Sequence, residues 1–209
     1  ALGSKHPEKV PASSGGCINA VVYWGQKKAT GEPWADGSPH PIGQGGSIHG
    51  DGATCLHHAE SATRFAPTEV WENRNPWLVR RVELIQDSCG AGKNRGGLGV
   101  NIEIEMLEDT FATTVCERTE LAPWGLKEGK EGMPNNCFLI DEDGTKKSIP
   151  KTTRVLIKKG NKVLIQNGGG GGYGDPSERK KEKILNDYKQ EYISKEYISK
   201  FYPQVVLND

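Results

Sequence analysis

The chain has 209 residues, enough for one compact domain or two small ones, and its 27 basic side chains balance 27 acidic ones. Because the formal net charge is zero, the composition argues against nucleic acid and anionic membranes as partners. No apolar run approaches the roughly 20 residues of a membrane span, and the N-terminus lacks the layout of a secretory signal, so we expect a cytoplasmic protein.

Cysteine and glycine usage set further limits. The five cysteines are scattered without any C-x-x-C pair, so the sequence predicts neither a disulfide framework nor a zinc ribbon. Apolar residues make up 34% of a chain that also carries 27 glycines. This apolar content is low for a self-sufficient domain of this length, which predicts that partner surfaces supply part of the stability.

The first 70 residues carry one convincing strand, and strand signals dominate the middle of the chain. The convincing strand covers residues 17–24, and residues 25–58 follow as a Gly-, Pro- and His-rich stretch without periodicity, which is typical of a loop that is functional or pinned by its neighbours. The remaining expected strands are rich in β-branched residues, and several of them alternate in polarity. They cover residues 77–85, 98–107, 111–117, 136–140, 154–158 and 162–166.

Short turns and helices are expected towards the end of the chain. Residues 141–144 and 158–161 are turn-like and predict short hairpins. Residues 177–190 predict an amphipathic helix, and Ser194 can cap a second short one. The prediction is therefore an α+β fold: a mostly β region with glycine-rich loops over residues 1–175 and a helical tail over residues 176–209.

A run of glycines precedes this tail: Gly168 to Gly172 are consecutive, and Tyr173 separates them from a further glycine, Gly174. A helix-start signal follows, because Asp175 is a good N-cap and Pro176 suits the first helical position. Ordering so many glycines is costly, which predicts close approach of another backbone or of a ligand. We expect Gly170, Gly172 and Tyr173 to lie at a subunit interface or a binding site.

The loop at residues 87–97 is the second glycine-rich segment. It resembles a phosphate loop only superficially, because Asp87 stands where a glycine is needed, Asn94 where Ser or Thr is needed, and the loop joins two strands. We expect a shaped loop that contacts a partner or substrate, in which Arg95 holds a carboxylate or phosphoryl group and matters more than Lys93. The candidate contact residues there are Asp87, Ser88, Gly90, Gly92 and Arg95. Cys89 lacks a neighbouring base in the sequence, which favours a buried structural role.

One cluster carries metal-type ligands: His49, Asp51, His57 and His58. Imidazoles and carboxylates suit zinc or manganese, but the spacing matches no established site. Hydrogen bonding within the loop, or substrate contact, is the preferred interpretation.

Several motifs together resemble the C-terminal portion of a B-type subunit of the hydantoinase B/oxoprolinase family. They are GGGGYGDP at residues 169–176, the glycine-rich hairpin at residues 72–100, and two short segments at residues 7–12 and 123–126 in matching order. The resemblance covers nearly the whole chain. It also implies that the chain corresponds to about the last third of such a subunit, with the remaining N-terminal part as a partner.

The resemblance implies the mechanism and the partners. N-methylhydantoinases, 5-oxoprolinases, and acetone and acetophenone carboxylases use an A-type subunit that binds ATP and Mg and phosphorylates a carbonyl or amide oxygen. The B-type subunit then completes either hydrolysis of the cyclic amide or attack of an enol-type carbon on activated carbon dioxide. A divalent metal, Zn or Mn, would lie in the part of the subunit outside this chain. We expect the chain to be inactive alone, and a noncatalytic assembly module is the other possibility.

Overall fold

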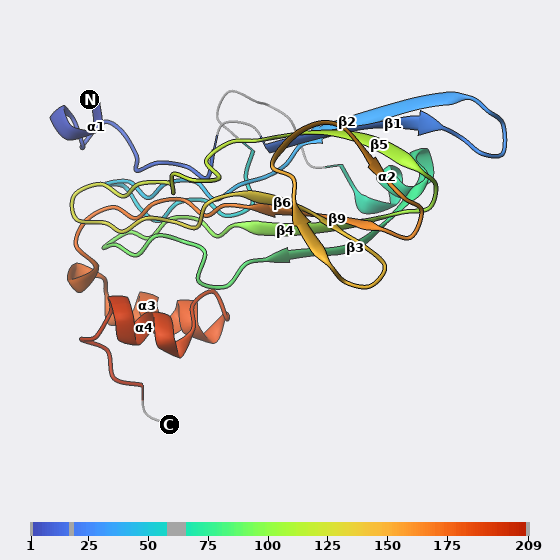
Figure 1. Ribbon diagram of the computed structural model, residues 1–209. Helices are drawn as coiled ribbons and strands as arrows, with labels where there is room; N and C mark the ends of the chain where they lie inside the picture. Colours follow the sequence, from blue (N-terminus) through green and yellow to red (C-terminus); the bar gives the residue numbers. More distant parts are fainter. Residues whose placement is uncertain (1, 17–18, 58–65, 208–209) are drawn as a thin grey trace.

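The computed structural model describes residues 2–16, 19–57 and 66–207. Two antiparallel sheets occupy one end of the molecule, extended glycine-rich segments occupy the other, and the C-terminal helices lie beside those segments (Figure 1). The predicted α+β class, with strands predominating and short helices at the C-terminal end, is confirmed. No helix within the described ranges has the length and apolarity needed to cross a membrane.

The first sheet has four strands in the order β2-β1-β5-β8. Strands β1 (Asn19–Gln26) and β2 (Pro33–Pro39) form a long hairpin, and β1 also pairs with β5 (Thr110–Cys116). Strand β8 (Lys151–Ile157) closes the other edge. All neighbours in this sheet are antiparallel.

The second sheet has five strands in the order β3-β4-β9-β6-β7. Their bounds are β3 Trp77–Leu84, β4 Val100–Met106, β9 Lys162–Asn167, β6 Asn136–Ile140 and β7 Lys146–Ser148. Again every neighbouring pair is antiparallel. The loop at residues 87–97 therefore does join two paired strands, β3 and β4, as the sequence predicts.

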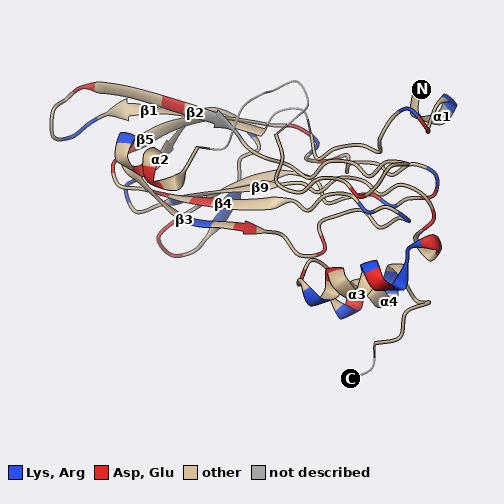
Figure 2. Cartoon of the chain, turned by 180° about the vertical axis from the view of Figure 1, so that it is seen from behind, with Lys and Arg blue, Asp and Glu red and all other residues tan. Residues whose placement is uncertain are grey.

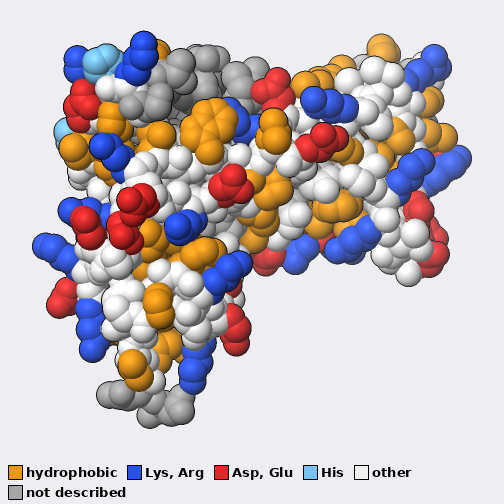
Figure 3. Space-filling view, turned by 60° about the vertical axis from the view of Figure 1, so that its left-hand side comes forward, with side chains coloured by type: hydrophobic (Ala, Val, Ile, Leu, Met, Phe, Trp, Pro, Cys, Tyr) orange, Lys and Arg blue, Asp and Glu red, His pale blue; other side chains and the backbone are white. Residues whose placement is uncertain are grey.

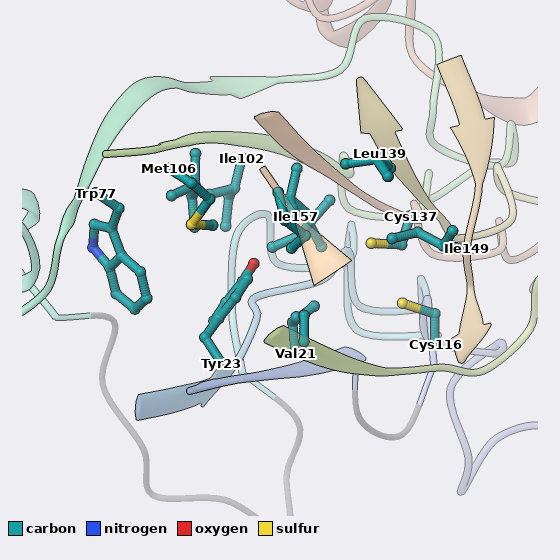
Figure 4. Close-up of a cluster of buried hydrophobic side chains, with 14 of the residues drawn as sticks. Val21, Tyr23, Trp77, Ile102, Met106, Cys116, Cys137, Leu139, Ile149 and Ile157 are labelled. Carbon is teal, nitrogen blue, oxygen red and sulfur yellow. The ribbon is translucent and has the colours of Figure 1, made fainter. Parts of the chain in front are cut away.

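The period-2 alternation of the strands creates the main core. In β4 the side chains of Val100, Ile102, Ile104 and Met106 are buried, while the residues between them are half-exposed. Side chains from both sheets meet between the layers, where Val21 and Tyr23 of β1 face Ile102 and Met106 of β4 (Figure 4). Burial of this apolar surface holds the two sheets together.

The outer faces of the two sheets differ in chemistry. On the five-stranded sheet, Arg80 pairs with Glu105 at 2.8 Å and Arg81 pairs with Glu103 at 3.0 Å, so charges cover β3 and β4 (Figure 2). On the four-stranded sheet, most outer side chains of β1 and β5 are apolar, although Arg154 lies over the Phe111 ring at 5.2 Å. Val22 is 44% exposed and Val115 is 46% exposed, and the Trp24 ring stacks on Phe111 with centroids 6.0 Å apart.

Short helices complete the fold. Helix α1 spans Leu2–Lys5 and α2 spans Thr68–Arg74. After the glycines come a 3-10 turn at Pro176–Glu178, α3 (Lys181–Lys189) and α4 (Lys195–Phe201). The predicted caps are confirmed, because Asp175 accepts a hydrogen bond from the Ser177 amide and Ser194 accepts one from the Tyr197 amide.

Two sequence expectations are wrong. Residues 33–39 form strand β2, although this part of the chain shows no strand periodicity. Its two prolines are tolerated because β2 lies at the sheet edge, where only one side must form ladder hydrogen bonds. The turn at residues 158–161 does not close a hairpin, since β8 and β9 belong to different sheets and the turn carries the chain from one layer to the other.

Candidate functional site

The glycines of residues 168–174 form the centre of a bundle of extended segments. Four of their amides donate to backbone carbonyls in three other segments: Gly170 to Gly97 at 2.9 Å, Gly171 to Ser13 at 2.8 Å, Gly172 to Lys130 at 2.9 Å, and Gly174 to Leu126 at 2.9 Å. A strand in a sheet bonds to two neighbours, so this arrangement is not a sheet. We call residues 12–16, 43–46, 88–97, 124–133 and 168–174 the glycine bundle.

Backbone packs directly against backbone in the glycine bundle. A Cβ atom on any glycine from Gly168 to Gly172 would lie closer than 3.0 Å to a backbone carbonyl oxygen, a separation that real Cβ atoms essentially never show. The oxygens belong to five separate positions in the chain: Met133, Ser88, Gln44, Trp124 and Ala91 in that order. The close approach predicted from the sequence is therefore present, and the approaching backbones belong to this chain itself.

The structure brings the two predicted glycine-rich segments together. The Gly90 amide donates to the Gly170 carbonyl at 2.7 Å, and Asn94 and Tyr173 exchange two amide–carbonyl bonds of 3.0 and 2.8 Å. The Gly92 amide donates to the Tyr202 hydroxyl at 3.2 Å. These donors, which an anion-binding loop would leave free, are used within the chain.

Asp87 and Ser88 also make bonds within the chain. Asp87 adopts a left-handed backbone conformation with φ of 62°, and its carboxylate accepts the Ser194 amide of the tail at 2.7 Å. The Ser88 hydroxyl donates to the Ile85 carbonyl and accepts the Gly99 amide at 2.8 Å. Both residues shape the start of the loop and fix it to neighbouring segments.

A network of buried ion pairs joins the glycine bundle to the helical tail. The Asp187 carboxylate of α3 lies 3.1 Å from Arg95 Nε and 2.6 Å from Arg179 Nη2, and the Arg179 side chain is only 1% exposed. Arg179 Nη1 continues to Asp51 at 2.6 Å. Burial raises the pKa of Asp51, but the hydrogen bond and charge of Arg179 outweigh it and lower that pKa below its ordinary value. The carboxylate expected to meet Arg95 is thus present, and it belongs to α3.

This ion-pair network also includes one candidate metal ligand, Asp51. Asp51 is bound to Arg179 and accepts the Arg95 amide at 2.9 Å, while His49 is exposed and His57 is buried. His58 lies outside the described residues. Within the described ranges, no three His, Cys, Asp or Glu side chains come together as metal ligands would.

His40, which is not among the candidates from sequence analysis, has a buried imidazole without hydrogen-bond partners among the described residues. Its ring packs against Trp71 with centroids 5.9 Å apart, and neither ring nitrogen has a partner within the described structure. Burial, reinforced by His57, lowers the pKa of His40 to about 3. His40 is therefore neutral in the folded chain at neutral pH.

We expect His40 to make the fold acid-sensitive. The unfolded chain takes up a proton near pH 6.5, whereas the folded chain resists protonation to about pH 3. Stability is thus full above pH 6.5 and falls as the pH drops through this window, by about 2 kcal/mol between pH 6.5 and 5. Urea unfolding at pH 7.5 and 5.0 should show that His40→Phe loses this part of the pH dependence. The exposed-site control His49→Gln should retain it, and equal loss in both variants would contradict the assignment.

Four aromatic side chains that could line a substrate pocket, Tyr23, Trp24, Trp34 and Trp71, lie mainly in the core. Tyr23 and Trp71 are buried and both pack edge-on against Trp77, and Trp34 does the same with centroids 5.6 Å apart. Trp24 lies on the outer face of the four-stranded sheet. Cys89 is 2% exposed, and burial raises its pKa, which disfavours the thiolate that a nucleophile needs.

A cavity of about 510 Å³ opens at the end of the glycine bundle. Tyr173, Gly174, Lys93 and Glu178 line it, together with a turn in which Lys127 and Glu128 both have left-handed backbone conformations. Lys93 and Glu178 form an exposed ion pair of 2.8 Å at its edge. Strained backbone of this kind is frequent at functional sites.

Basic and acidic side chains alternate over the molecular surface shown in Figure 3 without one sign dominating.

A family model described as hydantoinase B/oxoprolinase matches residues 1–176. The chain belongs to the hydantoinase B/oxoprolinase family. The B component of a putative D-/L-hydantoinase from Pseudomonas sp. strain NS671 is 30% identical over 198 residues, which cover 94% of this chain and 33% of that protein. The chain thus spans about a third of the length of such curated relatives.

Two solved structures share the fold. The crystal structure of the ATP-dependent caprolactamase from Pseudomonas jessenii aligns with a TM-score of 0.83 and 25% identity, covering all of this chain and 38% of that one. The nucleotide-free structure of an acetone carboxylase aligns with a TM-score of 0.76 and 16% identity over 96% of this chain and 31% of that one. The second likeness concerns the fold alone.

Proposed function

We propose that this chain is the C-terminal framework of a B-type subunit in an ATP-dependent enzyme that opens cyclic amides of the hydantoin or 5-oxoproline type. The observation that carries the proposal is the alignment of the whole chain with part of an ATP-dependent caprolactamase, because a lactam is itself a cyclic amide. In this enzyme an A-type subunit uses ATP and Mg to activate the amide oxygen, and the B-type subunit completes hydrolysis.

The role of this chain in that enzyme is to position other parts. Its glycine bundle is held by backbone hydrogen bonds and by contacts that leave no room for a methyl group, so its loops are fixed in place. A fixed framework of this kind supports catalysis because reacting groups must be held within fractions of an ångström. The cavity beside Tyr173 is the surface at which we place contact with the activated substrate or the A-type subunit.

The rest of the B-type subunit covers the outer face of the four-stranded sheet. This face exposes Val22, Val115 and Leu156 beside the Trp24–Phe111 stack, whereas ion pairs cover the outer face of the other sheet. A contiguous apolar face is the kind of surface that another polypeptide buries. The relatives' extra length, about two-thirds of each protein, supplies such a polypeptide.

The function is tested by producing the chain with the remainder of the B-type subunit and an A-type subunit. We expect ATP-dependent ring opening of hydantoin, 5-oxoproline or caprolactam by the assembled enzyme and no turnover by the chain alone. Ring-opened acid and released phosphate are the quantities to measure. Carboxylation of acetone or acetophenone by bicarbonate, in place of ring opening, would support the carboxylase alternative. Turnover by the isolated chain would contradict the framework role.

The assembled enzyme also tests whether the rest of the B-type subunit covers the outer face of the four-stranded sheet. Val22→Lys should reduce copurification of the rest of the subunit, because it places a charge on the apolar face. Val82→Lys is the matched control, since Val82 is 43% exposed on β3, the edge strand of the other sheet, and its change should leave assembly intact. Equal assembly of both variants would contradict this placement.

A further inference from the structure

Two cysteines from different sheets face each other inside the core. Cys116 ends β5 in the four-stranded sheet, and Cys137 lies in β6 of the five-stranded sheet. Both are 0% exposed, and their sulfur atoms point towards one another between the layers (Figure 4). A single buried cysteine is an ordinary core residue, but a facing pair of sulfurs is a preformed position for a covalent bond.

We propose that Cys116 and Cys137 form a disulfide that links the two sheets. Both side chains belong to the buried cluster between the sheets, so the fold brings the two thiols into one region of the core, where the bond would close the sulfurs to about 2.05 Å. It would join layers that are otherwise held together by apolar burial. A metal is a poorer occupant of this position, because two thiolates without a third ligand in the described structure do not make a metal site.

The chemistry is thiol–disulfide exchange with a small-molecule disulfide such as oxidised glutathione. One of the two cysteines, as its thiolate, attacks one sulfur of the oxidant and releases one glutathione thiolate. The thiolate of the other cysteine then attacks the sulfur of the first and releases the second glutathione thiolate. Two protein thiols lose two protons and two electrons, and one oxidised glutathione becomes two reduced molecules.

Burial determines when this exchange takes place. Because neither sulfur is exposed, a folded reduced chain shields both from the oxidant. Oxidation therefore accompanies folding, before the two sheets close, and the finished bond is shielded from reductants. Closing a loop of roughly 20 residues restricts the unfolded chain, which should raise the midpoint of thermal unfolding by roughly 5–10 °C.

Peptide mapping of the wild-type chain tests the bond directly. The chain is refolded from denaturant in a mixture of reduced and oxidised glutathione, free thiols are alkylated, and trypsin is added. We expect a linked species joining the peptide of residues 96–118 to that of residues 131–146, which contain Cys116 and Cys137 respectively. Recovery of both peptides with alkylated or glutathione-capped cysteines would overturn the proposal. So would a link from either one to another cysteine.

Thermal unfolding of the oxidised and reduced forms is the second measurement. Oxidation should raise the midpoint in the wild type and in Cys55→Ser, whose cysteine is exposed, but not in Cys116→Ala. An equal rise in Cys116→Ala would assign the effect to other cysteines and overturn the proposal. If Cys116→Ala fails to fold, the wild-type peptide map still decides the question.

Discussion

Replacing Gly170 with alanine is expected to destabilise the isolated chain by at least about 3 kcal/mol and to reduce its soluble yield. The new methyl group would collide with the Gln44 carbonyl oxygen, while hydrogen bonds to Gly97 and from Gly90 hold Gly170 in place. Since the obstacle is backbone, no change of rotamer relieves the collision. Relieving the collision requires movement of a whole backbone segment of the glycine bundle, and the neighbouring segments that pack against it restrict that movement.

Gly50→Ala is the matched control for this substitution. Gly50 has no other atom within 4 Å of the position that its Cβ would occupy, and its backbone is outside the left-handed region. We expect its urea-unfolding midpoint to equal that of the wild type or to rise slightly, through the unfolded state. An unchanged midpoint in Gly170→Ala would contradict the backbone contact described for the glycine bundle.

The glycine run shows how far sequence reasoning reaches. Its composition predicts that another backbone comes close, because so many ordered glycines are costly without such a contact. The sequence interpretation places that backbone in a partner, which predicts that Gly170→Ala leaves the isolated chain folded. In the structure the neighbours are Gln44, Ser88 and other segments of this chain. Carbonyl groups look alike in every residue, so nothing in the sequence identifies which of them is the neighbour.

The strands are more predictable than the buried charges. Alternation in residues 100–106 follows from the need to bury one face, which is local information. The partner of Arg95, in contrast, is Asp187, which lies 92 positions away on a helix. The sequence predicts a carboxylate or phosphoryl partner for Arg95, but only the docking of α3 on the glycine bundle selects this one. Strand β2 escapes prediction because an edge strand tolerates prolines.

The second large effect is expected at this buried carboxylate. Asp187→Ala leaves Arg95 and Arg179 without the acceptor that lies 3.1 and 2.6 Å from them, in a region where the carboxylate is 5% exposed. Breaking a buried ion pair by removing one partner costs about 3–5 kcal/mol. Lys93→Ala is the control, because the Lys93–Glu178 pair is more than half exposed and should contribute less than about 1 kcal/mol. Urea unfolding monitored by circular dichroism gives both values.

A double substitution separates an unpaired charge from simple loss of packing. If Asp187→Ala destabilises mainly by leaving the buried Arg179 with Asp51 as its one remaining carboxylate partner, then adding Arg179→Met should cost much less than it costs in the wild type. Asp51 loses its Arg179 partner in that variant, but it remains partly exposed and retains the Arg95 amide at 2.9 Å, so water and that donor can satisfy it. We therefore expect the two changes to be less than additive by about 1–3 kcal/mol. Strict additivity would mean that the two residues stabilise the junction of bundle and tail independently, and it would contradict a continuous network from Asp51 to Arg95.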